Sequence, residues 1–313
     1  MTDMQLPEMA TWAWIPVVIW AAFTQTLRNA AQRSLTSELG TLAATLVRFL
    51  YGLPFAACWL LIVTQLMPPD SAMPAFGGYY VAWLFLGAVA QIAATAFLLL
   101  AMTQRNFVVA VAFAKTEVLQ VALFATAFLS EVPSHWSFLA MAVSTVGVLM
   151  LSLPKKGVSK LTGSGAWHSR SAWFGLAAGA GFALASVGYR GAALTLPGVS
   201  PWLIGAWGVV LAQLLQTVLL GGWVAARDPG TLGKIARAWR LSTVAGAMGA
   251  LASIGWFTAF AMRPAVDVKT LSLIEVLFSY LVSRKLFSEQ MSRNEKIGLG
   301  LITAGLLVIS AQF

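Results

Sequence analysis

The stretch VAFAKTEVLQVALFATAFLSE (111–131) places a lysine, a glutamate and a glutamine inside an otherwise apolar run. A charge at the centre of a lipid bilayer costs at least about 2.5–3.5 kcal/mol, so such ions normally face a cavity or a partner. A second stretch, LSLIEVLFSYLVSRKLFSEQ (271–290), repeats the Glu-Val-Leu and Ser-Glu sequences at the same spacing. The buried ions therefore occur twice, and this repetition decides the predicted fold.

The composition is that of a protein embedded in a lipid bilayer. Of 313 residues, 59% are hydrophobic and 10% are charged, whereas soluble domains carry about 25% charged residues. The net charge of +9 comes from short basic clusters between apolar runs. Such clusters are typical of cytoplasmic loops, so we expect no nucleic-acid partner. A single cysteine, Cys58, excludes a disulfide framework and a cysteine-based metal cluster.

Ten segments are long and apolar enough to cross a membrane, which takes about 20 residues. Turn-forming residues separate them, as in MPPDSAMPAFGG (67–78) and ARDPGTLGK (226–234). We predict an all-α polytopic membrane protein with ten transmembrane helices. The expected spans are 12–32, 39–63, 79–101, 107–129, 136–153, 172–196, 201–225, 241–262, 267–286 and 297–312.

The distribution of lysine and arginine predicts the orientation. With ten spans, every strongly basic loop falls on one face of the membrane, including 154–170, 226–240 and 284–296. Cytoplasmic loops carry such an excess of positive charge. We therefore expect a multi-pass protein of the bacterial inner membrane with both termini outside the cytoplasm.

An internal duplication organises the chain. The offset that places Glu117 over Glu275 also pairs Arg105 with Arg263 and, further on, two central glycines. We predict a first five-helix repeat over 1–153, a basic cytoplasmic linker over 154–171 and a second five-helix repeat over 172–313. Because five is odd, the second copy must cross the membrane upside down. Inverted repeats place a solute site near the bilayer midplane and favour a transporter that works by alternating access.

The ends of the two halves resemble a known family. Each has an apolar helix, a Ser-Glu turn and a helix with a central glycine, in FLSEVPSHWSFLAMAVSTVGVLML (128–151) and LFSEQMSRNEKIGLGLITAGLLVI (286–309). TLVRFLYGLPFA (45–56) adds an Arg-Phe pair. The chain thus resembles the drug/metabolite transporter superfamily, in particular its EamA-type members. The resemblance implies a ten-helix carrier but names no substrate. Basic residues follow the first expected helix here, whereas in the family they follow the second, so the direction of transport is not carried over.

Ionisable side chains inside the expected spans are the candidate substrate-binding residues. Glu117 and Gln120 share a helix face. Each glutamate either binds a cationic group or a coupling proton, or forms a structural ion pair, for instance Glu117 with Arg48. Positive charges exceed the glutamates, and Arg48 and Lys115 lie too deep to reach the headgroups easily, which makes them candidates for an anion site. The candidates are Gln25, Arg48, Tyr51, Gln91, Lys115, Glu117, Gln120, Lys269 and Glu275.

The expected function is secondary transport of a small organic solute, anionic or zwitterionic, in either direction, by a monomer or weak homodimer. No nucleotide-binding motif or His-Glu-x-x-His pattern occurs in the sequence. We therefore expect no cofactor, no metal and no enzymatic activity, and coupling to a proton or solute gradient. A lipid flippase is the alternative interpretation. An intramembrane enzyme or a channel is less favoured, because neither catalytic groupings nor a filter is visible.

Overall fold

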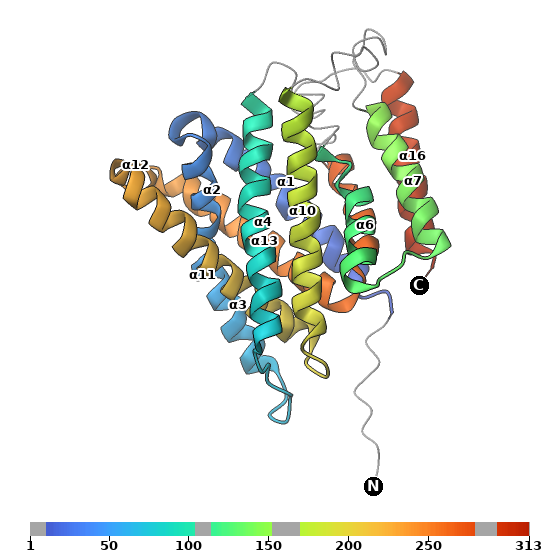
Figure 1. The fold of residues 1–313 in the computed structure, drawn as a ribbon, viewed down its shortest axis with the longest axis horizontal. Coiled ribbons are helices and arrows are strands. Elements are labelled where there is room, and N and C mark those ends of the chain that lie inside the picture. Colours follow the sequence, from blue (N-terminus) through green and yellow to red (C-terminus); the bar gives the residue numbers. More distant parts are fainter. Residues whose placement is uncertain (1–10, 104–113, 152–169, 279–292, 313) are drawn as a thin grey trace.

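The computed structural model describes residues 11–103, 114–151, 170–278 and 293–312. Throughout these ranges the regular elements are helices, and none is a strand (Figure 1). The helices are α1 (Trp14–Leu39), α2 (Thr41–Leu50), α3 (Leu53–Leu66), α4 (Gly78–Thr103), α6 (Glu117–Leu129), α7 (His135–Leu151), α10 (Arg170–Leu194), α11 (Pro201–Arg227), α12 (Pro229–Arg237), α13 (Trp239–Met262), α14 (Ala265–Leu271) and α16 (Arg293–Ser310).

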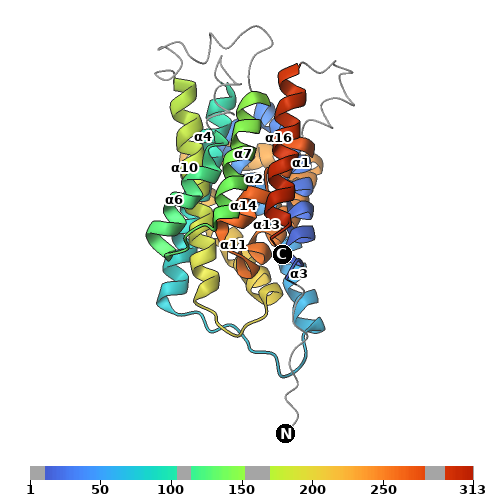
Figure 2. The same ribbon diagram turned by 90° about the vertical axis from the view of Figure 1, so that its right-hand side faces the viewer.

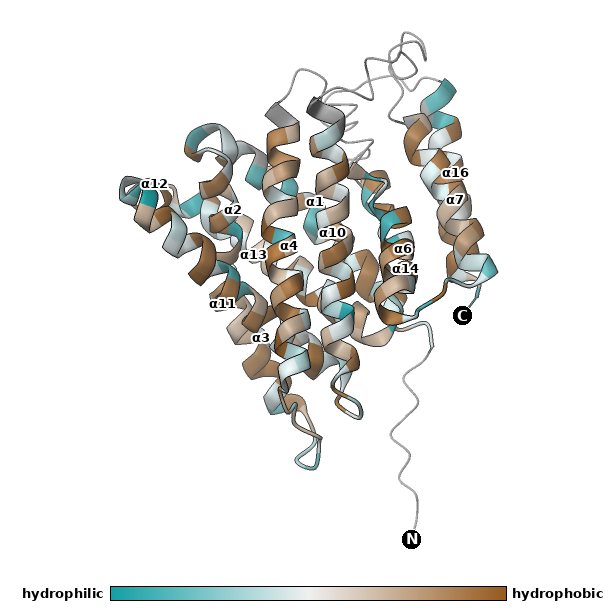
Figure 3. Cartoon of the chain, viewed as in Figure 1, coloured by the Kyte–Doolittle hydropathy of each residue, from teal (hydrophilic) through white to brown (hydrophobic). Residues whose placement is uncertain are grey.

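Four of the described helical segments are long and apolar enough to cross a membrane: Thr41–Leu66, Gly78–Ala101, Pro201–Arg227 and Trp239–Met262. Many large apolar side chains, such as Leu61, are exposed on the outside of the bundle. Hydrophobic residues dominate the middle of α4 and α10, and hydrophilic residues gather at α12 and at one end of α16 (Figure 3). An apolar exterior of this extent marks a surface made for lipid. The chain is an all-helical, membrane-associated protein.

The expected span 39–63 is confirmed as the helical segment Thr41–Leu66, which contains a turn at 51–52. The helix boundaries correct the sequence prediction in two other spans. The segments 107–129 and 267–286 were each expected to be one helix, but the structure interrupts them at 115–116 and at 272–273 respectively. Residues 104–113 and 279–292 of these spans lie outside the described residues.

The stretch 226–234, expected to be a loop, contributes to the short helix α12 instead. Pro229 stands in the first turn of that helix, where a missing backbone N–H costs nothing.

Three antiparallel helix pairs build most of the bundle: α4 with α10, α1 with α13, and α7 with α16. In Figures 1 and 2, α1 and α4 run upward and α10 and α13 run downward. Small residues allow the close approach. A Cβ added to Gly188 of α10 would lie 2.8 Å from the backbone nitrogen of Gly87 in α4. The packing of α1 on α13 is equally close, since a Cβ on Gly255 of α13 would lie 2.7 Å from the Ala21 Cβ in α1.

Candidate functional site

Two helix breaks meet in the middle of the bundle. One is the turn at 115–116, directly before Glu117 opens α6. The other is the turn at 272–273, between α14 and the helical turn that holds Glu275. The two breaks therefore lie within one residue of positions that the duplication matches, and α6 packs against α14. Breaks of this kind expose backbone groups inside a membrane protein only where they are buried or line a cavity.

A glycine of α10 makes room for the first break. A Cβ added to Gly179 would lie 3.0 Å from the Ala114 carbonyl oxygen and 3.4 Å from the Glu117 backbone nitrogen. Any larger residue would push α10 away from the turn. Gly179 belongs to a stretch rich in glycine and alanine (175–188), and such small residues let helices approach closely.

The charged residues at the breaks form two crossed ion pairs. Lys269 of α14 contacts Glu117 of α6, with 2.5 Å between Nζ and Oε1. Lys115 lies on the other side, with 3.5 Å between its Nζ and Oε2 of Glu275. Each pair joins one half of the chain to the other. The sequence-based suggestion that Glu117 pairs with Arg48 is wrong, since Lys269 is the partner of Glu117.

Two amides complete the surroundings of Glu275, whose side chain is 9% exposed. Gln25 donates a hydrogen bond from Nε2 to Oε2 at 2.7 Å. Asn29 donates one from Nδ2 to Oε1 at 2.9 Å. The amide oxygens also accept hydrogen bonds, Gln25 Oε1 from the Trp256 indole N–H at 2.9 Å and Asn29 Oδ1 from Arg28 at 2.7 Å. These acceptor bonds fix the orientation of both amides, so only their N–H groups face the carboxylate.

Trp256 connects the two ion pairs. Its ring lies beneath Lys269, with the Lys269 Nζ 5.4 Å from the ring centroid. Its indole N–H holds Gln25, as described above. An ammonium over an indole face gains a cation–π attraction. One residue of α13 thus positions the cation that pairs with Glu117 and the amide that binds Glu275.

Two buried arginines lie next to this network. Arg28 of α1 is 4% exposed and Arg48 of α2 is 2% exposed. Both side chains pass Gly249 of α13, where an added Cβ would lie 3.2 Å from Arg48 Cγ and 3.4 Å from Arg28 Cδ. Arg28 donates to Asn29, and Arg48 makes a long contact of 3.4 Å to the Thr95 hydroxyl. No carboxylate forms an ion pair with either one within the described ranges.

The remaining candidates lie apart from the carboxylates. Gln91 accepts hydrogen bonds from the Tyr189 hydroxyl at 2.9 Å and from Gln216 at 2.8 Å. Tyr51 points toward α12, with its hydroxyl 3.4 Å from the Ile235 carbonyl oxygen. Gln120 donates to the Thr116 hydroxyl at 2.9 Å and so spans the first helix break.

Sequence reasoning missed Thr95, Tyr189, Gln216 and Trp256. For Gln216 a signal was present, because Gln213 and Gln216 lie three residues apart on the same face of the apolar helix α11.

The end of the bundle that is lower in Figure 1 is tied by a third ion pair. Arg190 Nε donates to Glu131 Oε1 at 2.7 Å, and its Nη1 donates to the Phe260 carbonyl oxygen at 2.8 Å. The Ser137 hydroxyl donates to Asp267 at 2.7 Å. These bonds join the α6–α7 turn and the start of α7 to α10, α13 and α14. Arg190 thus holds the α6–α7 turn against α10 through Glu131.

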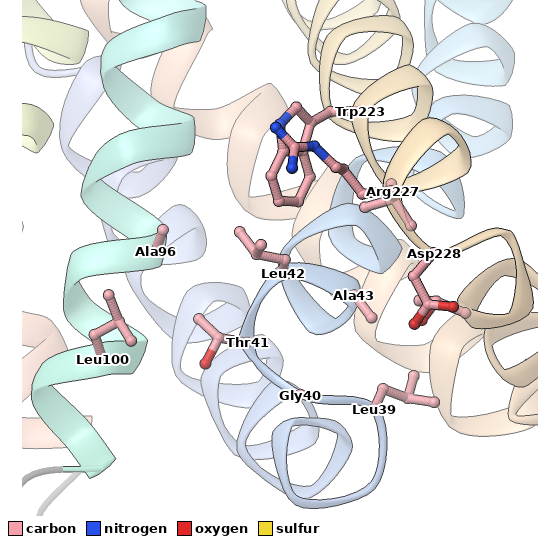
Figure 4. A pocket seen from close by; sticks show the side chains of 12 residues that line it. Leu39, Gly40, Thr41, Leu42, Ala43, Ala96, Leu100, Trp223, Arg227 and Asp228 are labelled. Carbon is pink, nitrogen blue, oxygen red and sulfur yellow. The ribbon is translucent and has the colours of Figure 1, made fainter.

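The opposite end carries an open pocket of about 430 Å³ between the α1–α2 turn, α4 and α11 (Figure 4). Its lining is mostly apolar. Arg227 lies over the Trp223 ring at its rim, with Cζ 5.9 Å from the ring centroid. None of the candidate substrate-binding residues lines it. The pocket is a hollow separate from the charged centre, and within the described residues no ion pair ties this end of the bundle.

Comparison with known proteins supports the fold and leaves the function to the site. No family model matches the chain, and no curated protein matches it. A solved structure described only as "Crystal structure of protein" has a TM-score of 0.66 to this chain at 15% sequence identity. The match covers 95% of this chain and 94% of that chain. At this identity the likeness concerns the fold alone, and it extends over nearly the whole length.

Proposed function

We propose that the protein is a secondary transporter that moves a small anionic or zwitterionic organic solute across the membrane by alternating access. The observation that carries this proposal is the crossed pairing of Lys115 with Glu275 and of Lys269 with Glu117. Buried ions cost several kcal/mol each unless they are paired. Ion pairs that cross between the two halves of a chain, at two matching helix breaks, suit a site that the halves share.

The packing of the helices supports an inverted repeat of two five-helix units. The first helix of each unit packs on the third helix of the other, in the pairs α1–α13 and α10–α4. The fourth helices meet as α6 and α14, and the fifth as α7 and α16. The first helices, α1 and α10, run in opposite directions (Figure 1). Such reciprocal contacts are expected of two copies related by a pseudo-two-fold axis in the membrane plane.

The two ends of the bundle differ in a way that suits alternating access. One end is tied by the pair of Arg190 with Glu131 and by the bond of Ser137 to Asp267. The other end has the open pocket at the α1–α2 turn. A carrier must close one end while the other opens. The tied end is the outer one in this proposal, because the basic stretch 226–240, which includes α12, lies at the opposite end (Figure 1).

The sequence resemblance to EamA-type transporters supports the same interpretation. It rests on the Ser-Glu turns and on the Arg-Phe pair at Arg48. The proposed location is the bacterial inner membrane, with both termini outside the cytoplasm. In Figure 1, α1 begins and α16 ends toward the tied end of the bundle.

Flux through proteoliposomes tests the proposal. Purified protein should give uptake that saturates with solute concentration and is accelerated by unlabelled solute on the other side. Flux that rises without saturation would indicate a channel. Transfer of a fluorescent lipid that water-soluble solutes do not inhibit would indicate a flippase. Either result would overturn the proposal.

Cysteine labelling tests alternating access directly. In a Cys58→Ala background, a cysteine at Ala265 reports on the tied end, where the native residue is 0% exposed. A cysteine at Thr41 reports on the open pocket. A saturating transported solute should change the labelling rates of the two positions in opposite directions. Parallel changes at both positions would contradict alternating access.

A further inference from the structure

The two buried arginines have more hydrogen-bond donors than the described residues satisfy. Arg28 Nε, Arg28 Nη1 and Arg48 Nε are buried, and the described residues offer them no acceptor. The two side chains also lie close together, since an added Cβ on Gly249 would lie 3.2 Å from Arg48 Cγ and 3.4 Å from Arg28 Cδ. A guanidinium stays charged in proteins, so neither residue can escape this cost by losing its proton. Unsatisfied buried charges of this kind call for an anion.

The charge balance of the centre gives the charge of that anion. Lys115 is neutralised by Glu275 and Lys269 by Glu117. The sequence suggested Lys115, together with Arg48, as a candidate for an anion site. Lys115 already has a carboxylate partner in Glu275, so it is not available to a bound anion. Arg28 and Arg48 remain as a surplus of two positive charges among the described residues of the centre. A ligand that carries two negative charges would balance them.

We infer that Arg28 and Arg48 form the binding site of a small organic dianion whose charges lie on carboxylate or phosphate oxygens. Guanidinium groups match such oxygens with paired N–H donors. The inference specifies the solute of the proposed transporter, and in that respect it rests on the proposed function. The nearby Gln213 supplies a further contact, since both its amide atoms are buried without a partner among the described residues.

The position of the site fits a shared interface between the halves. Both arginines come from the first half, on α1 and α2, and both stems are covered by Gly249 of α13 in the second half. Gln213 of α11 approaches the same region, because a Cβ on Gly52 would lie 2.6 Å from the Arg48 carbonyl oxygen and 2.9 Å from Gln213 Oε1. The solute reaches the guanidiniums when α13 separates from α1 and α2.

Ligand-induced thermal stabilisation of the purified full-length protein tests the site. The probes are succinate and glycerol 3-phosphate as dianions, acetate as a monoanion and glycerol as a neutral compound. We expect the dianions to raise the unfolding midpoint of the wild type more than acetate does, and glycerol to leave it unchanged. Arg28→Gln and Arg48→Gln should weaken dianion binding about thirtyfold or more. Arg240→Gln, which removes the same charge from an exposed position, should bind like the wild type.

A second measurement separates a binding role from a structural one. Arg48→Met replaces an unpaired buried charge by an apolar side chain, so it should raise the unfolding midpoint of the ligand-free protein while abolishing dianion binding. Arg48→Lys keeps the charge but loses the planar fork, and should fold normally with weakened dianion binding. A lowered midpoint in Arg48→Met with unchanged binding would assign Arg48 to the structure.

Other outcomes overturn the inference without touching the proposed function. Dianion binding that survives both glutamine variants, or acetate binding as tight as succinate binding, would refute the dianion site. Saturable proteoliposome flux of a neutral or zwitterionic solute, with no dianion bound, would leave a transporter of another substrate class. Dianion binding without any saturable flux would keep the site and remove the transport.

Discussion

Glu117 and Glu275 occupy matching positions in the two halves, but their surroundings differ. Glu275 accepts hydrogen bonds from Gln25 and Asn29 and has Lys115 nearby. Among the described residues, Glu117 has Lys269 as its ion-pair partner. The duplication kept the carboxylate in both halves and built amide donors around one of them. Glu275 is therefore fixed in one role by directional bonds, whereas Glu117 depends on a single long side chain.

The largest expected effect comes from reversing each ion pair. Glu117→Lys and Glu275→Lys alone should each abolish transport and destabilise the protein by about 3–5 kcal/mol, because each leaves like charges buried together. Adding Lys269→Glu to Glu117→Lys should restore most of the lost stability. About 1 kcal/mol should stay lost, because the cation–π contact of Lys269 with Trp256 is gone. Adding Lys115→Glu to Glu275→Lys should not restore the lost stability, because Gln25 and Asn29 would then aim N–H groups at an ammonium. Thermal unfolding midpoints and proteoliposome flux measure both exchanges.

The comparison between the two glutamates fails if the exchanges behave alike. Recovery in both double variants would mean that the amides reorient freely. Recovery in neither would mean that Glu117 is bound as specifically as Glu275. The wild type and the two double variants carry the same total charge, so differences between them report on local geometry.

Much of this centre could be predicted from the sequence, but which lysine pairs with which glutamate could not. The length of the apolar segments and the repeated Glu-Val-Leu sequence are local signals. From them the helical fold could be predicted, and Glu117 and Glu275 could be chosen as candidate site residues. The partner of Glu117 depends on how α6 packs on α14, which no local pattern encodes. The breaks at 115–116 and 272–273 carry neither proline nor glycine, so nothing in these residues marks an interruption. In α12, by contrast, Pro229, Gly230 and Gly233 suggested a loop, and burial of Ile235 favours the helix.

A moderate effect is expected from Trp256→Phe, which keeps a ring beneath Lys269 but removes the N–H that holds Gln25. The partly buried Gln25 oxygen then loses its donor, at a cost of about 1 kcal/mol. The lost stability should come from the hydrogen bonds around Glu275, because Gln25 is one of its donors. A double-mutant cycle of Trp256→Phe with Gln25→Ala should show coupling, and a cycle with Glu117→Gln should show little.

Trp207→Phe is the matched control, because the Trp207 indole N–H is buried with no hydrogen-bond partner in the described structure. Removing that N–H should leave stability unchanged or slightly raised. An equal loss in both phenylalanine variants would show that the size of the indole, and not its hydrogen bond, matters at position 256.

The smallest effect is expected at a carboxylate outside the membrane-spanning helices. This carboxylate is exposed to solvent, in contrast to Glu117 and Glu275. Asp228, between α11 and α12, accepts a hydrogen bond from the Thr231 hydroxyl at 2.7 Å. That bond, aided by Lys234, lowers the pKa of the Asp228 carboxyl below its usual range. A lowered pKa in the folded state adds stability above the unfolded pKa of about 3.9 and loses it as the pH falls through the folded value.

Thr231→Val should therefore lower the unfolding midpoint slightly at neutral pH, and the difference from the wild type should vanish under strongly acidic conditions. Transport should not change, because Asp228 is exposed to solvent and touches neither ion pair. A midpoint difference that grows as the pH falls would have the wrong sign for a lowered pKa. A loss of transport in Thr231→Val would mean that α12 and the open pocket beside it act on the charged centre.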